Sequence, residues 1–352
     1  MKRLSSGRRY VFAMLILIAA VGIFSAGCAR SGGIENDDTA DTSDKKIKIV
    51  ATLFPQYDFA RQIAGDYADV TLLLTPGMES HSYDLRPADM IEIKESDMFI
   101  YTGKYMETWA QTIIDSLDDS VMVVDVSEGI TLEKEEDYFV DEHDDHEHEH
   151  EDADDDEHDD DHDGHSHEGH SHEGHTHEYD PHIWTSPVYA MQMVENIADA
   201  LIAEDAAHAA EYRKRADEYI EQLKEVDAAF RQVSDEAEHK TIFFGGRFAM
   251  TYFIREYGFG CVSAYHDCSA ESEPSISSVM RMIDEIKETG AKAVFYEELV
   301  DPKVARTIAE ETGVKLLLLH SAHNVSRKEY EDGVTYLDIM WQNVENLKEG
   351  LN

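Results

Sequence analysis

Basic residues and cysteines are scarce in this 352-residue sequence. Only 30 Lys and Arg stand against 75 Asp and Glu, which gives a formal net charge of −45. Such an acidic chain repels phosphate backbones, so we expect no nucleic-acid partner. Three cysteines are too few for a disulfide framework, and the fold must therefore be held together by apolar burial. A hydrophobic content of 42% at this length is enough for a sizeable core in about two domains.

Long apolar runs are also missing, with one exception near the N-terminus. Four basic residues among the first nine precede the apolar run 10–24, which matches the core of a signal peptide and is short for a membrane span. The run ends in Ser25-Ala26-Gly27-Cys28, which resembles the lipobox of bacterial lipoproteins, although Ser25 stands where Leu is usual. Residues 1–28 are therefore expected to form a lipoprotein signal peptide, with a plain signal peptide or an uncleaved anchor as the alternative. Lipid-modified Cys28, followed by a flexible tether at 29–46, would hold the protein on the outer side of the bacterial cell membrane.

Short β-branched runs alternate with amphipathic stretches in two parts of the chain. Continuous apolar strands separated by helices are typical of a parallel sheet covered on both faces. The expected fold class is therefore α/β, with two lobes, residues 47–185 and 239–352, that each contain a four-stranded, mainly parallel sheet flanked by helices. The expected strands are Ile47–Phe54, Val70–Leu74, Met98–Thr102, Val121–Val126, Thr241–Gly246, Phe259–Tyr265, Ala293–Glu297 and Val314–Leu319. The expected helices are Tyr57–Tyr67, Pro87–Glu95, Tyr105–Leu117, Arg247–Tyr257, Ser275–Glu288 and Pro302–Glu311.

The segment between the lobes, 186–238, predicts one long helix. It is rich in Ala, Glu, Lys and Leu and contains no Gly, and Ser186 and Pro187 suit the N-cap and the first turn. We expect this helix to pack along both lobes as a rigid linker. Because ligands of open α/β sheets bind beyond the carboxyl ends of the strands, two facing lobes would place a site in the cleft between them.

Three histidines occupy positions from which they could reach this cleft. His81 follows the strand that ends at Leu74, His182 precedes the long helix, and His320 directly follows the last expected strand. These three are therefore the candidate metal ligands. His323, three residues after His320, is either a substitute for His320 or a residue that orients it.

Five segments occur in an order that resembles a known family: PGMESHSYDLRP, YDPHIWTSP, RFAMTYFIREYGF, ESEPS and AVFYEE. They resemble the zinc- and manganese-binding subunits of ABC importers, the metal-specific cluster of periplasmic or lipid-anchored solute-binding proteins. The resemblance covers nearly all of residues 47–352, and DPHxW after PGxxxHxY is its most specific part. It implies a two-lobed fold with a rigid linking helix, one metal in the cleft, and delivery of that metal to a membrane permease.

The resemblance assigns the family's ligand positions to residues of this chain. The first falls on His81 and the second on His182. The third falls on Arg247, where zinc members usually have His and manganese members Glu, and Arg cannot ligate a metal because its guanidinium has no free lone pair. The fourth, often Asp in manganese members, falls on His320. We therefore expect a three-histidine site, with a water or a carboxylate in the remaining position.

The expected cargo is Zn²⁺, because three neutral imidazoles suit zinc better than manganese, which prefers oxygen ligands. A ligating histidine usually donates its other N–H to an acceptor, and Glu297, Glu298 or Asp180 could serve. Glu297 could instead pair with Arg247. The order of residues along the chain leaves these alternatives open.

A His-rich acidic segment, 141–178, lies between the last strand of the first lobe and His182. It contains no Lys or Arg, and residues 141–180 carry 20 of the 75 acidic residues, which leaves 55 acidic against 30 basic residues elsewhere. Such a composition predicts a disordered loop. Pairs of the form His-x-His can share a zinc ion, so the segment is expected to capture, buffer or sense zinc weakly; a solvated acidic loop is the alternative. Its histidines are His143, His146, His148, His150, His158, His162, His165, His167, His170, His172, His175 and His177.

These patterns favour a monomeric solute-binding protein that captures Zn²⁺ and catalyses no reaction. A manganese-type or general metal-binding lipoprotein or adhesin is one alternative. A zinc hydrolase is another, because three histidines with an open position also form catalytic sites. No HExxH motif and no evident general base accompany the histidines, which counts against the hydrolase. Whether Cys261 and Cys268 form a disulfide stays open.

Overall fold

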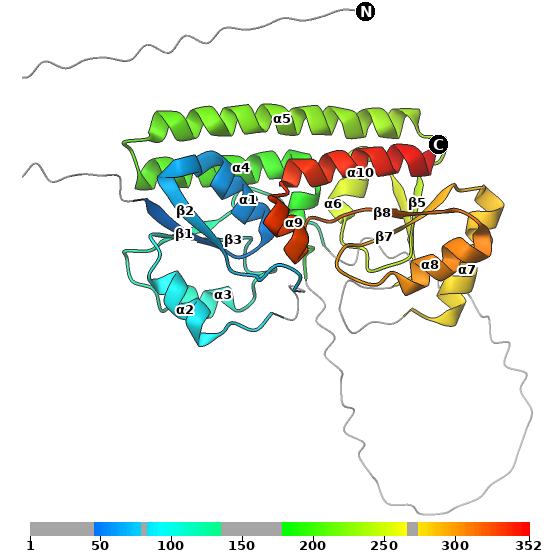
Figure 1. Cartoon of the computed structure of the whole chain (residues 1–352), viewed down its shortest axis with the longest axis horizontal. Coiled ribbons are helices and arrows are strands. Elements are labelled where there is room, and N and C mark those ends of the chain that lie inside the picture. The colour runs from blue at the N-terminus through cyan, green and yellow to red at the C-terminus, as the bar shows by residue number, and fades with distance from the viewer. Residues whose placement is uncertain (1–45, 79–82, 135–177, 266–273) are drawn as a thin grey trace, which may run out of the picture. The chain divides into compact units, whose positions relative to one another are not determined.

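Two four-stranded sheets organise the protein in a computed structural model that describes residues 46–78, 83–134, 178–265 and 274–352 (Figure 1). The expected signal peptide, the tether as far as residue 45, Cys28, His81, Cys268 and residues 141–177 of the His-rich segment lie outside the described residues. Residues Asp44–Asn352 form one compact unit. Within the described part, no helix is both long and apolar enough to cross a membrane.

The first sheet has the strand order β2-β1-β3-β4, and all its pairings are parallel. The central strands are buried on both faces, as the continuous apolar runs predict. Its strands are β1 (Ile47–Ala51), β2 (Ala68–Leu72), β3 (Met98–Tyr101) and β4 (Met122–Asp125).

The second sheet repeats this order as β6-β5-β7-β8, again with parallel pairings only. Its strands are β5 (Thr241–Phe244), β6 (Gly260–Ser263), β7 (Ala293–Tyr296) and β8 (Lys315–Leu318). All eight expected strands are present within a few residues of their expected bounds, so the predicted fold class is confirmed. Because all strands of a sheet are parallel, the loops after the strands lie at one edge, and the interior position of the first strand places the change in strand order there.

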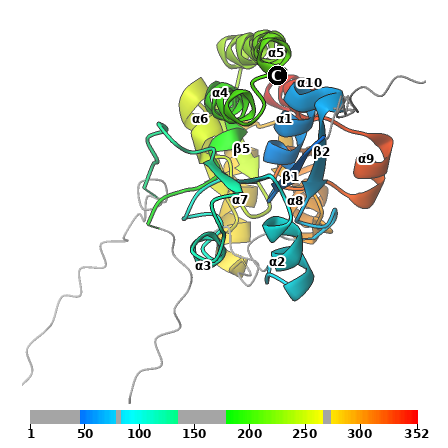
Figure 2. The same ribbon diagram turned by 90° about the vertical axis from the view of Figure 1, so that its left-hand side faces the viewer.

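Helices cover both faces of each sheet. The helices of the first series are α1 (Phe54–Ala64), the 3₁₀ turn η1 (Gly65–Tyr67), α2 (Pro87–Lys94) and α3 (Ala110–Ile114). Those of the second series are α6 (Thr251–Tyr257), α7 (Ile276–Thr289) and α8 (Lys303–Thr312). In the first lobe, α2 and α3 enclose one apolar cluster with Val50, Phe99 and Val121, whereas α1 packs on the opposite face. Figures 1 and 2 both show α1 on one side of this sheet and α2 and α3 on the other.

The linker between the lobes differs from the expected single helix. It consists of α4 (Pro187–Glu204) and α5 (Ala209–Glu236), which form a helical hairpin (Figure 1). Ser186 caps α4 as expected, since its Oγ accepts a hydrogen bond from the Val188 N–H. The helix ends at Asp205, whose carboxylate accepts the Ala207 N–H and lies 2.5 Å from His208 Nδ1. These side-chain hydrogen bonds of Asp205 compete with continuation of the helix. The Ala-rich composition of the segment does not predict such a break.

Helix α5 packs on both lobes, because it contacts α1 of the first and α6 and α10 of the second. The C-terminal helices α9 (Arg327–Asp332) and α10 (Tyr336–Leu351) were not expected. Each begins with a capping box, formed by Ser326 with Glu329 and by Thr335 with Asp338. These short motifs are the sequence signal for both helices. One apolar cluster joins Phe59, Trp184 and residues of α4, α5 and α10 to both sheets.

Candidate metal-binding site

Loops at the carboxyl ends of the strands enclose a cavity of about 110 Å³. The first lobe contributes the loop after β2, and the second contributes the loops after β5, β7 and β8. This position between two parallel sheets is the one that the strand order predicts for a ligand site. The lining residues are Gly77, Met78, Arg247, Glu298, Leu299, Val300, His323 and Asn324.

His182 lies in the loop that precedes α4, and its side chain is buried. Its Nδ1 is 2.7 Å from Asp180 Oδ1, and the same oxygen accepts the His182 backbone N–H at 2.8 Å. Burial acts to raise the pKa of Asp180, but the charge and hydrogen bonds of His182 outweigh it and hold that pKa below its usual value. An ionised Asp180 favours the tautomer with the proton on Nδ1, which gives Nε2 the lone pair that a metal needs.

The second lobe fixes the loop that carries His182. Tyr252 Oη donates to the Asp180 carbonyl at 2.6 Å, and Tyr336 Oη donates to the Trp184 carbonyl at 2.5 Å. Trp184 Nε1 in turn donates to the Ser321 carbonyl at 2.9 Å. Hydrogen bonds to buried carbonyls are costly to break, so this loop holds the His182 ring in place.

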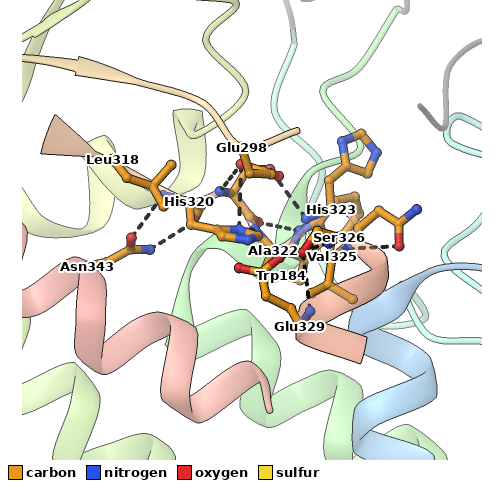
Figure 3. Close-up of polar contacts among 12 residues, drawn as sticks. Trp184, Glu298, Leu318, His320, Ala322, His323, Val325, Ser326, Glu329 and Asn343 are labelled. Carbon is orange, nitrogen blue, oxygen red and sulfur yellow. Dashed lines mark hydrogen bonds and ion pairs between the residues drawn. The ribbon is translucent and has the colours of Figure 1, made fainter. Parts of the chain in front are cut away.

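His323 lies beside His182. The two ring centroids are 5.1 Å apart with an interplanar angle of 87°, and the His323 ring is also 5.1 Å from the Trp184 ring. Ala322 has a positive φ of 60°, which turns the chain sharply between His320 and His323. This turn directs the two histidines differently (Figure 3), and His323 rather than His320 lines the cavity.

His320 is buried against the second lobe. Asn343 brackets its backbone, since Asn343 Oδ1 accepts the His320 N–H at 2.9 Å and Nδ2 donates to the His320 carbonyl at 2.8 Å (Figure 3). His320 Nδ1 accepts the Ala322 N–H at 2.9 Å and lies 3.5 Å from Glu298 Oε2. An accepting Nδ1 places the proton of the neutral ring on Nε2, which is buried without a hydrogen-bond partner among the described residues. A ring with its proton on Nε2 cannot bind a metal through Nε2. The hydrogen bond from Ala322 therefore disfavours His320 as a ligand, and its ligand role stays a prediction.

Arg247 pairs with Glu297, which is one of the alternatives left open by the sequence. Glu297 Oε1 accepts the Arg247 backbone N–H at 3.2 Å and lies 3.5 Å from Nε. Gly246 makes room for this carboxylate, because a Cβ at that position would lie 1.5 Å from Glu297 Oε2. Burial raises the pKa of Glu297. Glu298 has a separate role, because its two oxygens accept the N–H and the hydroxyl of Ser321.

The loop that leads to His81 is tied to the loop that carries His323. Asn324 Nδ2 donates to the carbonyls of Thr75 and Met78 at 3.0 and 2.9 Å, and the Gly77 N–H donates to the Val325 carbonyl at 2.8 Å. Asn324 was not among the expected site residues, and its position next to His323 is the one sign of its role in the sequence. Through these bonds the two lobes meet at the cavity.

The structure thus brings His182, His323, Arg247, Glu297 and Glu298 to one region. Among the described residues alone, no three His, Cys, Asp or Glu side chains are arranged to hold a metal ion. A complete site would need a further ligand, and His81 lies outside the described residues just beyond Met78. Cys261 forms no disulfide within the described part of the chain.

A larger cavity of about 340 Å³ lies at the carboxyl ends of β3 and β4. The described residues that line it include Tyr101, Lys104, Asp125 and Ser127, and none of these described residues is a histidine. Because it offers no imidazole donor, we assign the candidate metal site to the smaller cavity.

Comparison with known proteins shows extensive similarity to metal-binding proteins. The family model described as zinc-uptake complex component A, periplasmic (ZnuA) matches residues 49–350. The high-affinity zinc uptake system protein ZnuA of Bacillus subtilis is 33% identical over 338 residues, which cover 96% of this chain and 97% of that protein. The zinc-binding lipoprotein AdcA of Streptococcus pneumoniae is 29% identical over 341 residues, which cover 95% of this chain and 60% of AdcA.

A solved structure shows the same fold. The Zn(II)-bound ZnuA-like domain of Streptococcus pneumoniae AdcA superimposes with a TM-score of 0.67 at 26% identity, over 87% of this chain and 99% of that domain. The similarity therefore extends over both lobes and the linker.

Proposed function

This chain belongs to the ZnuA family, component A of zinc-uptake complexes, and on that basis we propose that it binds Zn²⁺ between its lobes and passes it to an ABC permease. The family consists of zinc-uptake components, and the chain is homologous to ZnuA and AdcA along nearly its whole length. The single observation that carries the metal site is the contact between the His182 and His323 rings, which belong to different lobes.

The proposed ligands are His81, His182 and His323. His182 is held by Asp180 in the tautomer that ligates through Nε2, and His323 lines the cavity next to it. His81 follows the loop that Asn324 fixes at the cavity wall. His320 is the alternative third ligand, and it would then have to give up the hydrogen bond that its Nδ1 accepts from Ala322.

Zinc is the proposed cargo because the donors are imidazole nitrogens. Zn²⁺ binds histidine at ~2.0–2.1 Å in tetrahedral sites, whereas Mn²⁺ prefers carboxylates, carbonyls and water. Glu298, which lines the cavity, is engaged by Ser321, and Glu297 is engaged by Arg247. Their carboxylate oxygens are therefore poorly placed to serve as ligands for Mn²⁺.

We infer capture and release rather than catalysis. A zinc hydrolase needs a base that activates the metal-bound water. Glu298 lines the cavity, but both its oxygens accept hydrogen bonds from Ser321, which suits a structural role.

We also propose that a lipid anchors the protein to the cell membrane. A relative of this chain is named a zinc-binding lipoprotein, and Cys28 is the residue that a lipid anchor would use. We propose that the protein works as a monomer tethered to the outer side of the cell membrane, where it meets the permease.

The His-rich segment 141–178 is proposed to bind zinc weakly. The described residues on either side of it are joined, since Lys134 pairs with Tyr179 and the Asp180 N–H donates to the Glu133 carbonyl at 2.8 Å. The described residues that flank the segment, Lys134 and Tyr179, therefore lie beside each other and next to Asp180, which contacts His182. Zinc bound by the segment would be released close to the proposed site.

Zinc titration tests this function. The full chain, a variant without residues 141–178, and His182→Ala should be compared by competition with a chromophoric chelator. One tight site that survives the deletion and is lost in His182→Ala supports the proposal. Loss of all tight binding on deletion of the segment would instead make the segment the main zinc site.

A further inference from the structure

The larger cavity, at the carboxyl ends of β3 and β4, is lined by different residues from the proposed metal site. Its volume is about 340 Å³, and its described lining shares no residue with that of the smaller cavity. Because a water occupies ~30 Å³ in the liquid, this volume has room for a ligand of roughly ten non-hydrogen atoms. Cavities of this size at the carboxyl edge of a parallel sheet are typical small-molecule sites.

The loop after β3 forms a fixed wall of this cavity. The N–H groups of Thr102 and Gly103 donate to the buried Glu107 carboxylate at 3.1 and 3.2 Å. Gly103 has a φ of 136°, and a Cβ there would lie 2.8 Å from Ser127 Oγ in the loop after β4. Glycine therefore allows the two loops to meet. Since the wall is formed before a ligand binds, little ordering opposes binding.

Two groups of opposite charge, Asp125 and Lys104, line this cavity. Asp125 Oδ1 accepts the N–H and the hydroxyl of Ser127 at 2.9 and 2.6 Å, which orients the carboxylate. Burial and the nearby Asp125 charge raise the pKa of Tyr101 to about 12, so its phenol stays protonated beside that carboxylate. Lys104 Nζ lies 4.6 Å from the centre of the Tyr105 ring. Within the described part of the chain, neither Asp125 nor Lys104 forms an ion pair.

This pair of charges favours a ligand that carries both signs. A simple anion would be attracted by Lys104 and repelled by Asp125, and a simple cation would meet the reverse. A zwitterion can place its ammonium at Asp125 and its carboxylate at Lys104, which gives two charge-assisted hydrogen bonds. A free α-amino acid of about ten non-hydrogen atoms has this pair of charges and the right size.

Other parts of the lining are apolar or aromatic. Tyr101, Tyr105, Met106 and Leu132 all contribute to the described lining. Aromatic rings and thioethers pack well against the side chain of leucine, methionine or phenylalanine. A strongly polar ligand side chain would lose part of its hydration against these groups without gaining a partner.

We propose that this cavity binds a free α-amino acid with an apolar or aromatic side chain, whose ammonium pairs with Asp125 and whose carboxylate pairs with Lys104. Every residue in this assignment lies in the described part of the chain. The site is separate from the proposed metal site, and the proposal does not depend on zinc binding. The protein would then carry two ligands of different chemistry.

Isothermal titration of the zinc-free full chain with L-phenylalanine, L-leucine and L-methionine tests this proposal. Zinc is removed beforehand because amino acids chelate it. Saturable binding of one molecule per chain is expected. Two analogues separate the charges, since 2-phenylethylamine lacks the carboxylate and 3-phenylpropionate lacks the ammonium. Each should bind roughly tenfold or more weakly than L-phenylalanine, the usual effect of losing a hydrogen bond between charged groups.

Variants assign the two charges. Asp125→Asn should weaken L-phenylalanine binding roughly tenfold or more, but it should not weaken 3-phenylpropionate, which has no ammonium. Lys104→Met should weaken L-phenylalanine and 3-phenylpropionate but not 2-phenylethylamine. Asp118→Asn is the matched control for the carboxylate, because Asp118 likewise accepts the N–H and the hydroxyl of Ser120 and does not line the cavity. Lys94→Met, at another exposed lysine, is the control for the ammonium.

Three results would overturn the proposal, and none of them bears on the zinc site. The first is that none of the three amino acids binds the wild-type chain. The second is that both analogues bind as tightly as L-phenylalanine, in which case the cavity does not select a zwitterion; this comparison needs no variant and holds even if Asp125→Asn fails to fold. The third is equal binding of L-phenylalanine to wild type, Asp125→Asn and Lys104→Met, which would place the amino acid elsewhere on the protein.

Discussion

The imidazole rings of His182 and His323 meet at 5.1 Å, edge to face, although one precedes α4 and the other follows β8. Each ring is positioned differently. Asp180 Oδ1 lies at hydrogen-bond distance from His182 Nδ1, and the turn at Ala322 orients His323. The proposed ligation by both rings, one from each lobe, would make zinc binding sensitive to the relative position of the lobes.

Asp180→Asn should weaken zinc binding by roughly 10–100-fold without unfolding the protein. The neutral amide no longer favours the Nδ1-protonated tautomer of His182, and loss of such a partner typically has this effect. Chelator competition measures the affinity, and thermal unfolding checks the fold. Asp205→Asn is the matched control, because it removes a similar carboxylate from His208 at the α4–α5 turn. An equal loss of affinity in both variants would show that the effect is only structural.

His323→Ala should abolish the tight zinc site, whereas His320→Ala should leave zinc binding measurable and lower stability instead. The reason is that His323 lines the cavity, and His320 is buried with its Nδ1 bonded to Ala322. Removing a buried, bonded side chain costs about 1–3 kcal/mol. Titration and urea unfolding of both variants give the comparison. The reverse pattern, with zinc lost only in His320→Ala, would make His320 the third ligand.

Asn324→Ala should lower both stability and zinc affinity. It leaves the Thr75 and Met78 carbonyls without their donor, at a cost of about 1–3 kcal/mol, and frees the loop that leads to His81. Asn196→Ala is the matched control, because Asn196 also donates to two backbone carbonyls, those of Val126 and Glu128. We expect both variants to lose the same stability. Only Asn324→Ala should release zinc faster. Similar off-rates in the two variants would argue against coupling between the loops.

Glu107 should make stability fall as pH rises toward neutrality. Burial raises its pKa from 4.5 to about 7, against hydrogen bonds from Thr52, Thr102 and Gly103. Below pH 4.5 the carboxyl is protonated in both folded and unfolded chains, so its contribution is fully present there. Between pH 4.5 and 7 the unfolded chain releases the proton first, which costs the folded state up to about 3 kcal/mol above pH 7.

The variant Glu107→Gln removes this titration. The difference in free energy of unfolding between Glu107→Gln and wild type should therefore shift by about 3 kcal/mol in favour of the variant between pH 4.5 and pH 8. Urea unfolding across that pH range measures this shift. The exposed Glu225→Gln serves as the control and should show no such trend. A pH-independent difference for Glu107→Gln would mean that this carboxyl does not retain its proton in the fold.

The sheets could be predicted from the sequence because their strands are short and mostly apolar and the central strands are buried on both faces, so that these appear as continuous apolar runs. The linker could not be predicted as two helices, because the break at Asp205 depends on one side chain bonding to its own neighbouring backbone. Helix α10 was missed, although Thr335 and Asp338 form a capping box at its start.

The site was predictable only in part for a similar reason. His182 could be identified from its motif, and the pairing of Arg247 with Glu297 could be foreseen as one alternative. The positive φ of Ala322 decides whether His320 or His323 reaches the cavity. Alanine rarely adopts this conformation, so the sequence does not predict it. Asn324 was overlooked because its role exists only when the loop before Met78 lies against it.

The central claim is that zinc is held by histidines from both lobes. It is tested most directly by a zinc-loaded crystal structure of the protein lacking residues 141–178, with anomalous difference maps on either side of the zinc absorption edge. The account predicts one strong peak in the cavity lined by His323, ~2.0–2.1 Å from nitrogens of His182, His323 and His81. A peak elsewhere, or a zinc ion in the cavity without His182 among its ligands, would contradict it.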